Sequence, residues 1–287
     1  MTRVPVLRGR NQSPPVVEVR GGPGGLSVDS LVELWQFREV LWAFIVRHVK
    51  VKYKQAAVGV GWAIVQPVLS AILFAIFLGR LARIPSDGVP YLLFAFAGMI
   101  AWTYFSVAAG SAMESLVADQ ALLRKVYFPR EILPLAAVGA ALVDLMVGLI
   151  TLFVAATLFG ILPGLAWLAL PLPILLLVIM ATALGLGISA INVYYRDVRY
   201  ALPFVLQFAL FASPVVYPLS LVPSTWRTLY AIVNPVAAAI DGLRRITLHH
   251  QPPDWGITFA SLIWALVLLL ASAFLFKRLE RSFSDRV

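Results

Sequence analysis

Six long apolar blocks limit what this chain can fold into, because a helix needs about 20 apolar residues to cross the roughly 30 Å core of a bilayer. Strands of a membrane barrel would alternate apolar and polar residues, so continuous blocks favour helices. Composition agrees, since 61% of the 287 residues are hydrophobic and only 13% are charged, too few to cover a soluble fold. We therefore predict an all-α integral membrane protein with six transmembrane helices, the fifth being the shortest, at Gly61–Gly79, Tyr91–Ser111, Ile132–Gly160, Leu168–Asn192, Ala201–Tyr217 and Gly256–Phe276.

A further apolar segment, Leu229–Asp241, lies between the fifth and sixth blocks and is too short to span a bilayer. Asn234-Pro235 interrupts it, which suits a periplasmic re-entrant hairpin better than a seventh span. Charge supports the count of six, because one side of the membrane then carries 18 Lys and Arg residues and the other side carries 5. Since positive loops face the cytoplasm, we expect a multi-pass protein of the bacterial inner (cytoplasmic) membrane with both termini in the cytoplasm.

The region before the first block divides into two parts. Residues 1–28 are rich in Gly, Pro and Arg without an apolar run, so we expect a disordered cytoplasmic extension. Residues 29–57 carry an apolar stripe at spacings of three and four, which predicts an amphipathic interface helix on the membrane surface. That helix either only anchors the chain or also docks a partner. The six-span transmembrane domain then covers residues 58–276, and residues 277–287 form a cytoplasmic tail.

Several kinds of chemistry are absent from the sequence. Without cysteine and with only three histidines, the chain offers no disulfide, no thiolate ligand and little for a metal centre. No lysine follows a glycine, so there is no Walker A loop, and any ATP must be hydrolysed on another chain. No HExxH or GxSxG motif occurs, which argues against a membrane enzyme. The basic residues accompany the spans rather than forming a separate stripe, so we expect no nucleic-acid partner.

Four stretches stand out in order along the chain: Lys50–Pro67, Leu122–Pro134, Asn192–Arg199, and Asn234-Pro235 with Arg244-Arg245. On a six-span topology this set resembles the ABC-2 type transporter permeases. It is most similar to the polysaccharide-export branch, which moves O-antigen, capsule and teichoic-acid chains. The resemblance covers about Ser30 to Arg281, nearly the whole chain.

The resemblance implies a transport subunit rather than an enzyme. Such permeases pair as two copies, here a homodimer among membrane lipids, around a central path. They bind ATP-binding cassette subunits, which carry the ATP and magnesium, so no cofactor is expected on this chain. The substrate would be a lipid-linked polysaccharide, a polyprenyl-diphosphate glycan moved from cytoplasm to periplasm. The alternatives are an ABC-2 exporter of small lipids or drugs, an ion-driven carrier, and a membrane enzyme that modifies glycans.

On this resemblance, the loop between the second and third spans contacts the ATP-binding subunits and couples their movement to opening. Pro129 would fix a turn in this loop and give it a defined direction. The alternative is a positively charged loop that only sets topology. The candidate coupling residues are Glu114, Arg124, Lys125, Tyr127, Phe128, Arg130 and Glu131.

Basic residues also cluster at the expected cytoplasmic mouth of the first span. Guanidinium and ammonium groups suit the anionic oxygens of a lipid diphosphate. They would equally attract anionic lipid headgroups, which is the alternative interpretation. The candidate diphosphate-binding residues are Arg47, Lys50, Lys52 and Lys54.

Aromatic rings in the second and fifth spans suit a glycan path, because a flat ring contacts the CH face of a sugar without a fixed hydrogen-bond pattern. Packing between helices or against lipid is the alternative. The candidate path residues are Phe94, Trp102, Phe105, Phe204, Phe208 and Phe211. The resemblance also implies a periplasmic gate at the hairpin, for which the candidates are Asn234, Pro235, Arg244 and Arg245.

Asp144 is the only acidic residue inside a predicted span, and such residues are costly in a membrane. We expect it to pair with a basic residue of another helix or to hold a polar contact near the path. A proton relay would need further acidic residues in the spans, and the sequence has none there.

Overall fold

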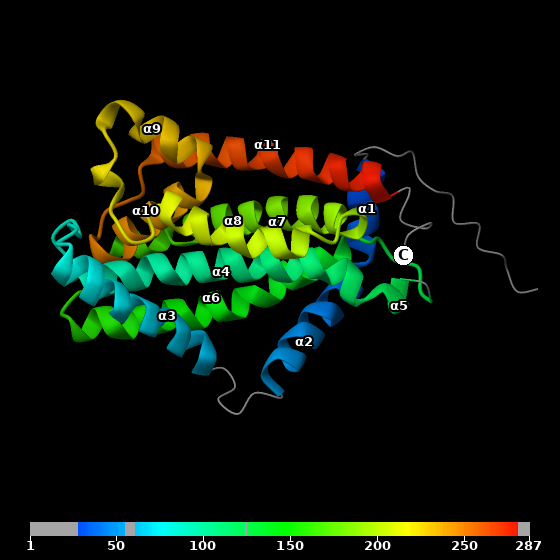
Figure 1. The fold of residues 1–287 in the computed structure, drawn as a ribbon, viewed down its shortest axis with the longest axis horizontal. Helices are drawn as coiled ribbons and strands as arrows, with labels where there is room; N and C mark the ends of the chain where they lie inside the picture. The colour runs from blue at the N-terminus through cyan, green and yellow to red at the C-terminus, as the bar shows by residue number, and fades with distance from the viewer. Residues whose placement is uncertain (1–27, 55–60, 124, 281–287) are drawn as a thin grey trace, which may run out of the picture.

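The computed structural model describes residues 28–54, 61–123 and 125–280, and every regular element in these ranges is helical (Figure 1). The elongated bundle has helices α3, α4, α6, α7 and α11 along its length. In chain order the elements are α1 Val28–Gln36, α2 Arg38–Lys54, α3 Trp62–Phe74, η2 Ala75–Leu81, α4 Tyr91–Ala118, α5 Gln120–Leu123, α6 Ile132–Leu158, η3 Leu165–Ala169, α7 Pro171–Tyr194, α8 Val198–Ala212, η4 Leu219–Leu221, α9 Ser224–Val233, α10 Pro235–Leu248 and α11 Trp255–Glu280.

Five helical stretches are long and apolar enough to cross a membrane: α3 with η2, then α4, α6, η3 with α7, and α11. Each overlaps one of the predicted blocks, because apolar length is the signal that both share. The prediction of an all-helical integral membrane protein is therefore confirmed. The sequence underestimated α4, which continues to Ala118 and not only to Ser111, since the polar residues of its last turns lie beyond the apolar block.

The fifth predicted span, Ala201–Tyr217, is wrong at its carboxyl end. The helix found there, α8, has 15 residues, which is fewer than a span of about 20 requires. It ends at Ala212 because Ser213 precedes Pro214, and a proline disfavours helical geometry in the residue before it. Ser213 accordingly has an extended ψ of 151°. The count of six spans stays a prediction.

Helix α4 forms the centre of the bundle and is the most buried of the long helices. It packs against α3, α6, α7 and α10. Small residues let these helices approach closely, as is common in membrane proteins. A Cβ atom added at Gly185 of α7 would lie 2.7 Å from the Cβ of Ala112, and one added at Gly148 of α6 would lie 2.9 Å from Ile100. These glycines therefore set the spacing of the core.

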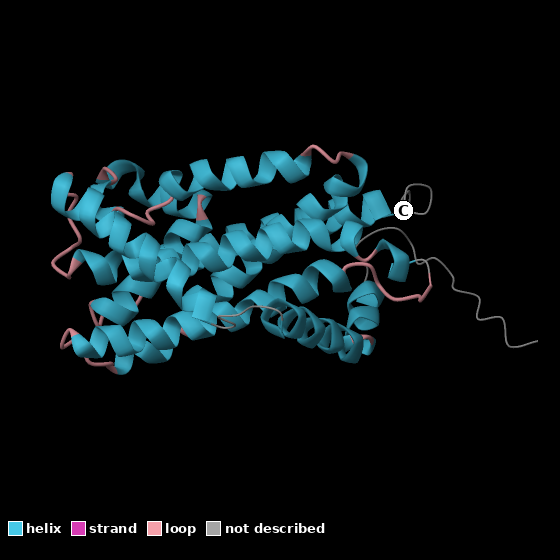
Figure 2. Cartoon of the chain, turned by 60° about the horizontal axis from the view of Figure 1, so that its bottom comes forward, coloured by secondary structure: helices cyan, strands magenta, loops and turns pink. Residues whose placement is uncertain are grey.

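The bundle has two distinct ends. We call the end with α1, α5 and the last turn of α11 the α1 end, and the end with α9 and α10 the hairpin end (Figure 1). Figure 2 shows that most loops lie at these two ends, where they connect the long helices.

The amino-terminal region differs from the single surface helix predicted over residues 29–57. It forms two helices, α1 and α2, which are separated at Phe37, and α1 already begins at Val28. Helix α2 packs along α6, where Ile45 lies against Gly139. At its far end Lys52 forms an ion pair with Asp144, near the middle of α6. Helix α2 therefore packs along a long apolar helix, and the position of this region at the membrane surface stays a prediction.

The predicted boundaries at the two termini lie mostly outside the described residues. The proposed disordered extension, 1–28, lies outside the described residues except for Val28, which is helical, and the end of the proposed interface helix falls within residues 55–60, which also lie outside them. The predicted tail, 277–287, is helical as far as Glu280, because α11 continues past its apolar block.

The predicted break at Asn234-Pro235 is present between α9 and α10. The side-chain oxygen of Asn234 accepts a hydrogen bond from the backbone N–H of Ala237 at 3.3 Å, and Pro235 occupies the first turn, where its missing N–H is not needed. Helix α10 is buried on nearly every side by α4, α7, α9 and α11. The entry of this hairpin into a membrane stays a prediction.

Candidate functional site

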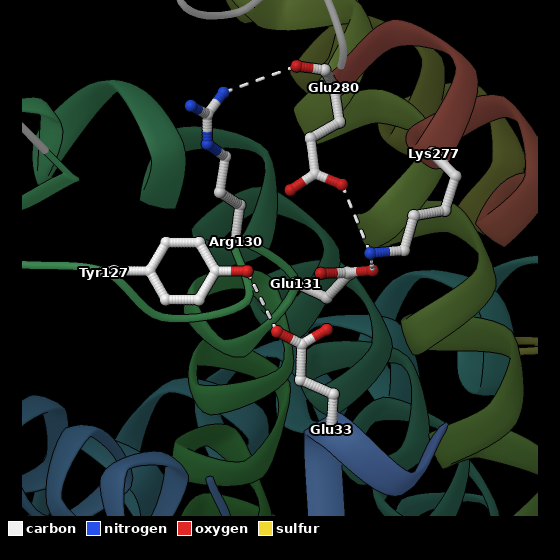
Figure 3. Close-up of polar contacts among 6 residues, drawn as sticks. All are labelled: Glu33, Tyr127, Arg130, Glu131, Lys277 and Glu280. Carbon is white, nitrogen blue, oxygen red and sulfur yellow. Dashed lines mark hydrogen bonds and ion pairs between the residues drawn. The ribbon is translucent and has the colours of Figure 1, made fainter. Parts of the chain in front are cut away.

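The segment after α5 joins three helices at the α1 end, in a set of contacts that we call the α1-end junction (Figure 3). The Tyr127 hydroxyl donates a hydrogen bond to Glu33 Oε1 of α1 at 3.0 Å. Arg130 Nη1 donates to the backbone oxygen of Glu280 in α11 at 3.4 Å. The remaining members are Glu131 and Lys277.

Lys277 holds the centre of the junction. Its ammonium pairs with Glu131 at the start of α6 and lies 3.2 Å from Glu280 Oε2. The side chains of Glu131 and Lys277 are 8% and 18% exposed. Removal of one partner of such a buried pair leaves an uncompensated charge, which is strongly destabilising. The pair therefore fixes the end of α11 to the start of α6.

Backbone carbonyl oxygens in the last turn of α11 accept further hydrogen bonds from side chains elsewhere in the chain. The Tyr194 hydroxyl, at the end of α7, donates to the carbonyl oxygen of Leu279 at 2.8 Å. With the Arg130 contact, two consecutive carbonyls of this turn bind side chains from two other parts of the chain.

Three consecutive residues of the connecting segment have different environments. Val126 and Tyr127 are 55% and 58% exposed, whereas Phe128 is 5% exposed. The Phe128 ring lies 5.5 Å from that of Phe44 in α2, centroid to centroid, in an apolar cluster that also contains Phe276. Partial burial and the hydrogen bond to Glu33 raise the pKa of Tyr127, so its hydroxyl keeps the proton that it donates. A displacement of this segment would therefore reach α2 through Phe128.

The other predicted coupling residues lie elsewhere. Glu114 is an ion-pair partner of Arg199 at 3.7 Å, between α4 and the start of α8. Lys125 is exposed beside Val126. Arg124 lies outside the described residues. The structure thus brings Tyr127, Arg130 and Glu131 together at the α1-end junction and leaves Glu114 outside it (Figure 3).

The four predicted diphosphate-binding residues divide into two groups. Arg47, Lys50 and Lys54 line a shallow groove of about 510 Å³ along one face of α2. Arg47 also bonds to Asp119 Oδ1 at 2.9 Å. Lys52 points away from this groove and pairs with Asp144, which also accepts a hydrogen bond from the Tyr53 hydroxyl. The expectation that Asp144 pairs with a basic residue of another helix is confirmed.

The predicted path aromatics do not share one surface. Phe94, Trp102 and Phe105 are at most 6% exposed and lie inside the subunit. Trp102 and Phe105 line an apolar cavity of about 400 Å³ between α4, α7, α8 and the start of α10. By contrast, the rings of α8 are exposed on its outer face: Phe204, Phe208 and Phe211. A role of either set in a glycan path stays a prediction.

The predicted gate residue Arg244 is buried, with only 3% of it exposed. Its guanidinium donates hydrogen bonds to four backbone carbonyls, one on α4 and three in the segment after α8: Phe94, Pro214, Val215 and Tyr217. Asn234 bonds to Ser213 Oγ of the same segment at 2.9 Å. The Arg245 side chain, in contrast, donates to the loop carbonyl of Pro252 at 3.1 Å. Arg244 and Asn234 therefore fasten α10 to the end of α8.

The sequence analysis did not identify Gly98, which lies against the Arg244 guanidinium. A Cβ atom there would clash with the Arg244 guanidinium and the Val215 carbonyl oxygen. Arg244 donates to backbone atoms, which every residue has, so the sequence does not reveal where its guanidinium lies. Without that position, Gly98 is simply a glycine within an apolar helix.

The long apolar helices define a multi-pass α-helical membrane protein. The chain matches the family described as ABC-2 type transporter over residues 39–248, and it belongs to this family. Membership indicates a transport subunit rather than an enzyme, and it implies an ATP-binding cassette partner.

Curated relatives agree with this assignment. The chain is 27% identical over 256 residues to the O-antigen export system permease protein RfbA of Myxococcus xanthus, covering 89% of this chain and 98% of that protein. It is 22% identical over 248 residues to a protein of the same name from Klebsiella pneumoniae, covering 83% and 91% of the two chains.

Proposed function

We propose that this protein is the permease subunit of an ATP-driven exporter that moves a lipid-linked polysaccharide, a polyprenyl-diphosphate glycan of the O-antigen kind, from cytoplasm to periplasm. The observation that carries the proposal is the match to O-antigen export permeases over nearly their full length. We place the protein in a bacterial inner membrane with its α1 end in the cytoplasm, which the excess of Lys and Arg on that side supports.

The α1-end junction is our candidate for coupling to the ATP-binding subunit. Val126 and Tyr127 offer an exposed contact surface, and the buried neighbour Phe128 connects that surface to α2. The Glu131–Lys277 pair connects the same segment to α11. Closure of the ATP-binding subunits would push on this segment and move α2 and α11 together.

The groove formed by Arg47, Lys50 and Lys54 is our candidate for the lipid diphosphate. Its two lysines have no carboxylate partner among the described ion pairs, and they lie on one face of α2. Lys52 is a weaker candidate than we expected, because Asp144 neutralises it.

We further propose that two copies of the chain enclose the path. Helix α3 buries little of its apolar surface within the subunit, and α8 exposes three phenylalanine rings. A second copy would cover such surfaces in part, and the remaining rings would face the glycan.

Purification of the tagged chain from its native membranes in a gentle detergent tests the proposal. We expect an ATP-binding cassette subunit in stoichiometric amount, vanadate-sensitive ATP hydrolysis, and accumulation of a lipid-linked glycan in cells depleted of the chain. Isolation without an ATPase, from membranes in which transport is active, would contradict the exporter and favour an ion-driven carrier. Accumulation of a small lipid in place of a glycan would contradict the proposed substrate.

A further inference from the structure

A cavity of about 160 Å³ with both apolar and polar walls lies between α2, α3, α4 and α6, separate from the basic groove and from the α1-end junction. Most of a membrane bundle is apolar inside, so a concentration of polar groups there calls for an explanation. The polar side chains that line it are Lys52, Tyr53, Gln66, Thr103, Tyr104 and Asp144.

One group in this cavity lacks a partner. Tyr104 is 1% exposed, and its hydroxyl has no hydrogen-bond partner within the part of the chain that the structure describes. Native proteins leave few buried polar groups unpaired, because the loss of hydration is not recovered. Because Tyr104 lines the cavity, a polar ligand bound there would supply the missing partner.

The cavity is deep but open on one side. Asp144 lies near the midpoint of α6, roughly 18 Å from its first residue at about 1.5 Å per residue. At that depth the Lys52 side chain is still 48% exposed on the single subunit, and Trp62 is 55% exposed beside the cavity. Ionisable groups at such depth face a bundle interior or water rather than lipid. The mouth of the cavity is therefore expected to open toward an aqueous path.

The charges select the kind of ligand. Asp144 and Lys52 cancel each other, and a diphosphate would meet the Asp144 carboxylate. A neutral polyhydroxyl compound suits the site better, because its hydroxyls both donate to Asp144 and accept from Lys52 or Tyr104. The exposed Trp62 ring offers a flat apolar face beside these polar groups. The volume is close to that of an apolar cavity of about 150 Å³ that holds benzene in another protein, so one face of a sugar ring fits inside while its remaining hydroxyls extend through the open side.

We propose that this cavity binds one neutral hexose ring of the transported glycan, held by Asp144, Lys52 and the hydroxyls of Tyr53 and Tyr104. The inference rests on the proposed function and adds to it a sugar-binding site inside the membrane domain. It differs from the basic groove, whose ligand is anionic.

The absence of cysteine from the chain allows a direct test. A single Ala63→Cys substitution places a thiol on the cavity wall without removing a polar group. In the purified complex with its ATP-binding subunit, we would measure alkylation by a charged maleimide with and without the methyl glycosides of glucose, galactose, mannose and rhamnose. We expect the thiol to react, at least one glycoside to slow the reaction, and inorganic pyrophosphate to leave it unchanged.

Variants then test the named groups. Tyr104→Phe should raise the half-protecting glycoside concentration by about threefold to tenfold, the range of one hydrogen bond. Asp144→Asn combined with Lys52→Gln keeps the site neutral and should abolish protection. Tyr200→Phe, at an exposed tyrosine of α8, should change nothing and serves as the control.

Three results would overturn the sugar site: protection by pyrophosphate instead of glycosides, protection by neither, or a thiol that the charged reagent cannot reach. These results are separate from the test of the proposed function. If the ATPase copurifies and depleted cells accumulate a lipid-linked glycan, absent protection removes only the sugar site. If no glycan accumulates, the exporter proposal fails, and a glycoside-protected thiol would then identify a sugar site in a different transporter.

Discussion

The guanidinium carbon of Arg244 lies 3.5 Å from the centroid of the Phe94 ring, and Arg244 Nε donates a hydrogen bond to the carbonyl oxygen of the same residue at 3.1 Å. One side chain of α10 thus engages both the ring and the backbone of a single residue in α4. A cation held over an aromatic face and away from water is a strong contact. This relationship makes the hairpin part of the core and not a loose flap.

Substitutions at this contact should destabilise the protein. We expect Arg244→Gln to cost about 1.5–3 kcal/mol, the range for a hydrogen bond to a charged group, because several backbone acceptors lose their donor. Gly98→Ala should have a similar effect, since its methyl group would occupy the position of the guanidinium. Thermal unfolding in detergent measures both. Arg245→Gln is the matched control and should stay within about 0.5 kcal/mol, so an equal loss there would contradict the assignment.

The buried pair at the α1-end junction gives a second prediction. Lys277→Met leaves Glu131 and Glu280 without their shared cation, and we expect a loss of about 3–5 kcal/mol with reduced membrane levels. The double variant Lys277→Met with Glu131→Gln should recover part of that loss. Arg278→Met, at the exposed neighbouring position, should be nearly neutral. A single variant as stable as the wild type would mean that the pair does not hold α11.

The exposed side of the connecting segment gives a third prediction, which concerns the partner. Val126→Asp should weaken retention of the ATP-binding subunit about tenfold or more, equivalent to about 1.4 kcal/mol, while the unfolding temperature stays unchanged. Pull-down of the partner from membranes measures this. Leu221→Asp, an exposed position at the hairpin end, should retain the partner fully. Normal retention by the Val126 variant would place the partner elsewhere.

The basic groove gives a fourth prediction. Lys50→Glu combined with Lys54→Glu should stop export and cause the lipid-linked glycan to accumulate, with normal membrane levels, because the diphosphate would meet two carboxylates. Attraction to anionic lipid alone, about 1 kcal/mol per charge, would predict a smaller and graded effect. Arg278→Glu reverses an exposed charge at the α1 end, outside the groove. Equal loss of export in that control would argue for a general electrostatic effect.

Much of the fold could be predicted because apolar length is a property of the sequence alone. Five long helical stretches follow from it. The break at Asn234-Pro235 was predictable for another reason, because local backbone chemistry fixes it. Ser213-Pro214 also signals the end of α8 in the sequence. We predicted a longer helix because the apolar block continues past this proline.

The site was less predictable because its partners are distant in the sequence. Charged and aromatic residues gather visibly in the sequence of the proposed coupling segment, whose role stays a prediction, but its link to Lys277 and Glu280 is a tertiary contact that a single sequence does not reveal. Lys50, Lys52 and Lys54 look alike in the sequence, and helix α2 separates them by turning Lys52 toward Asp144. The hydrogen bonds of Arg244 could not be predicted because their acceptors are main-chain atoms, and its role in a gate stays a prediction.

The two carbonyls at Leu279 and Glu280 have a practical consequence for anyone who handles this protein. Because Tyr194 and Arg130 use them as acceptors, a chain shortened to end before Leu279 would remove a brace between α7, α6 and α11. Affinity tags and fluorescent fusions should therefore start after Glu280, and a protease site intended to release them belongs beyond that residue as well.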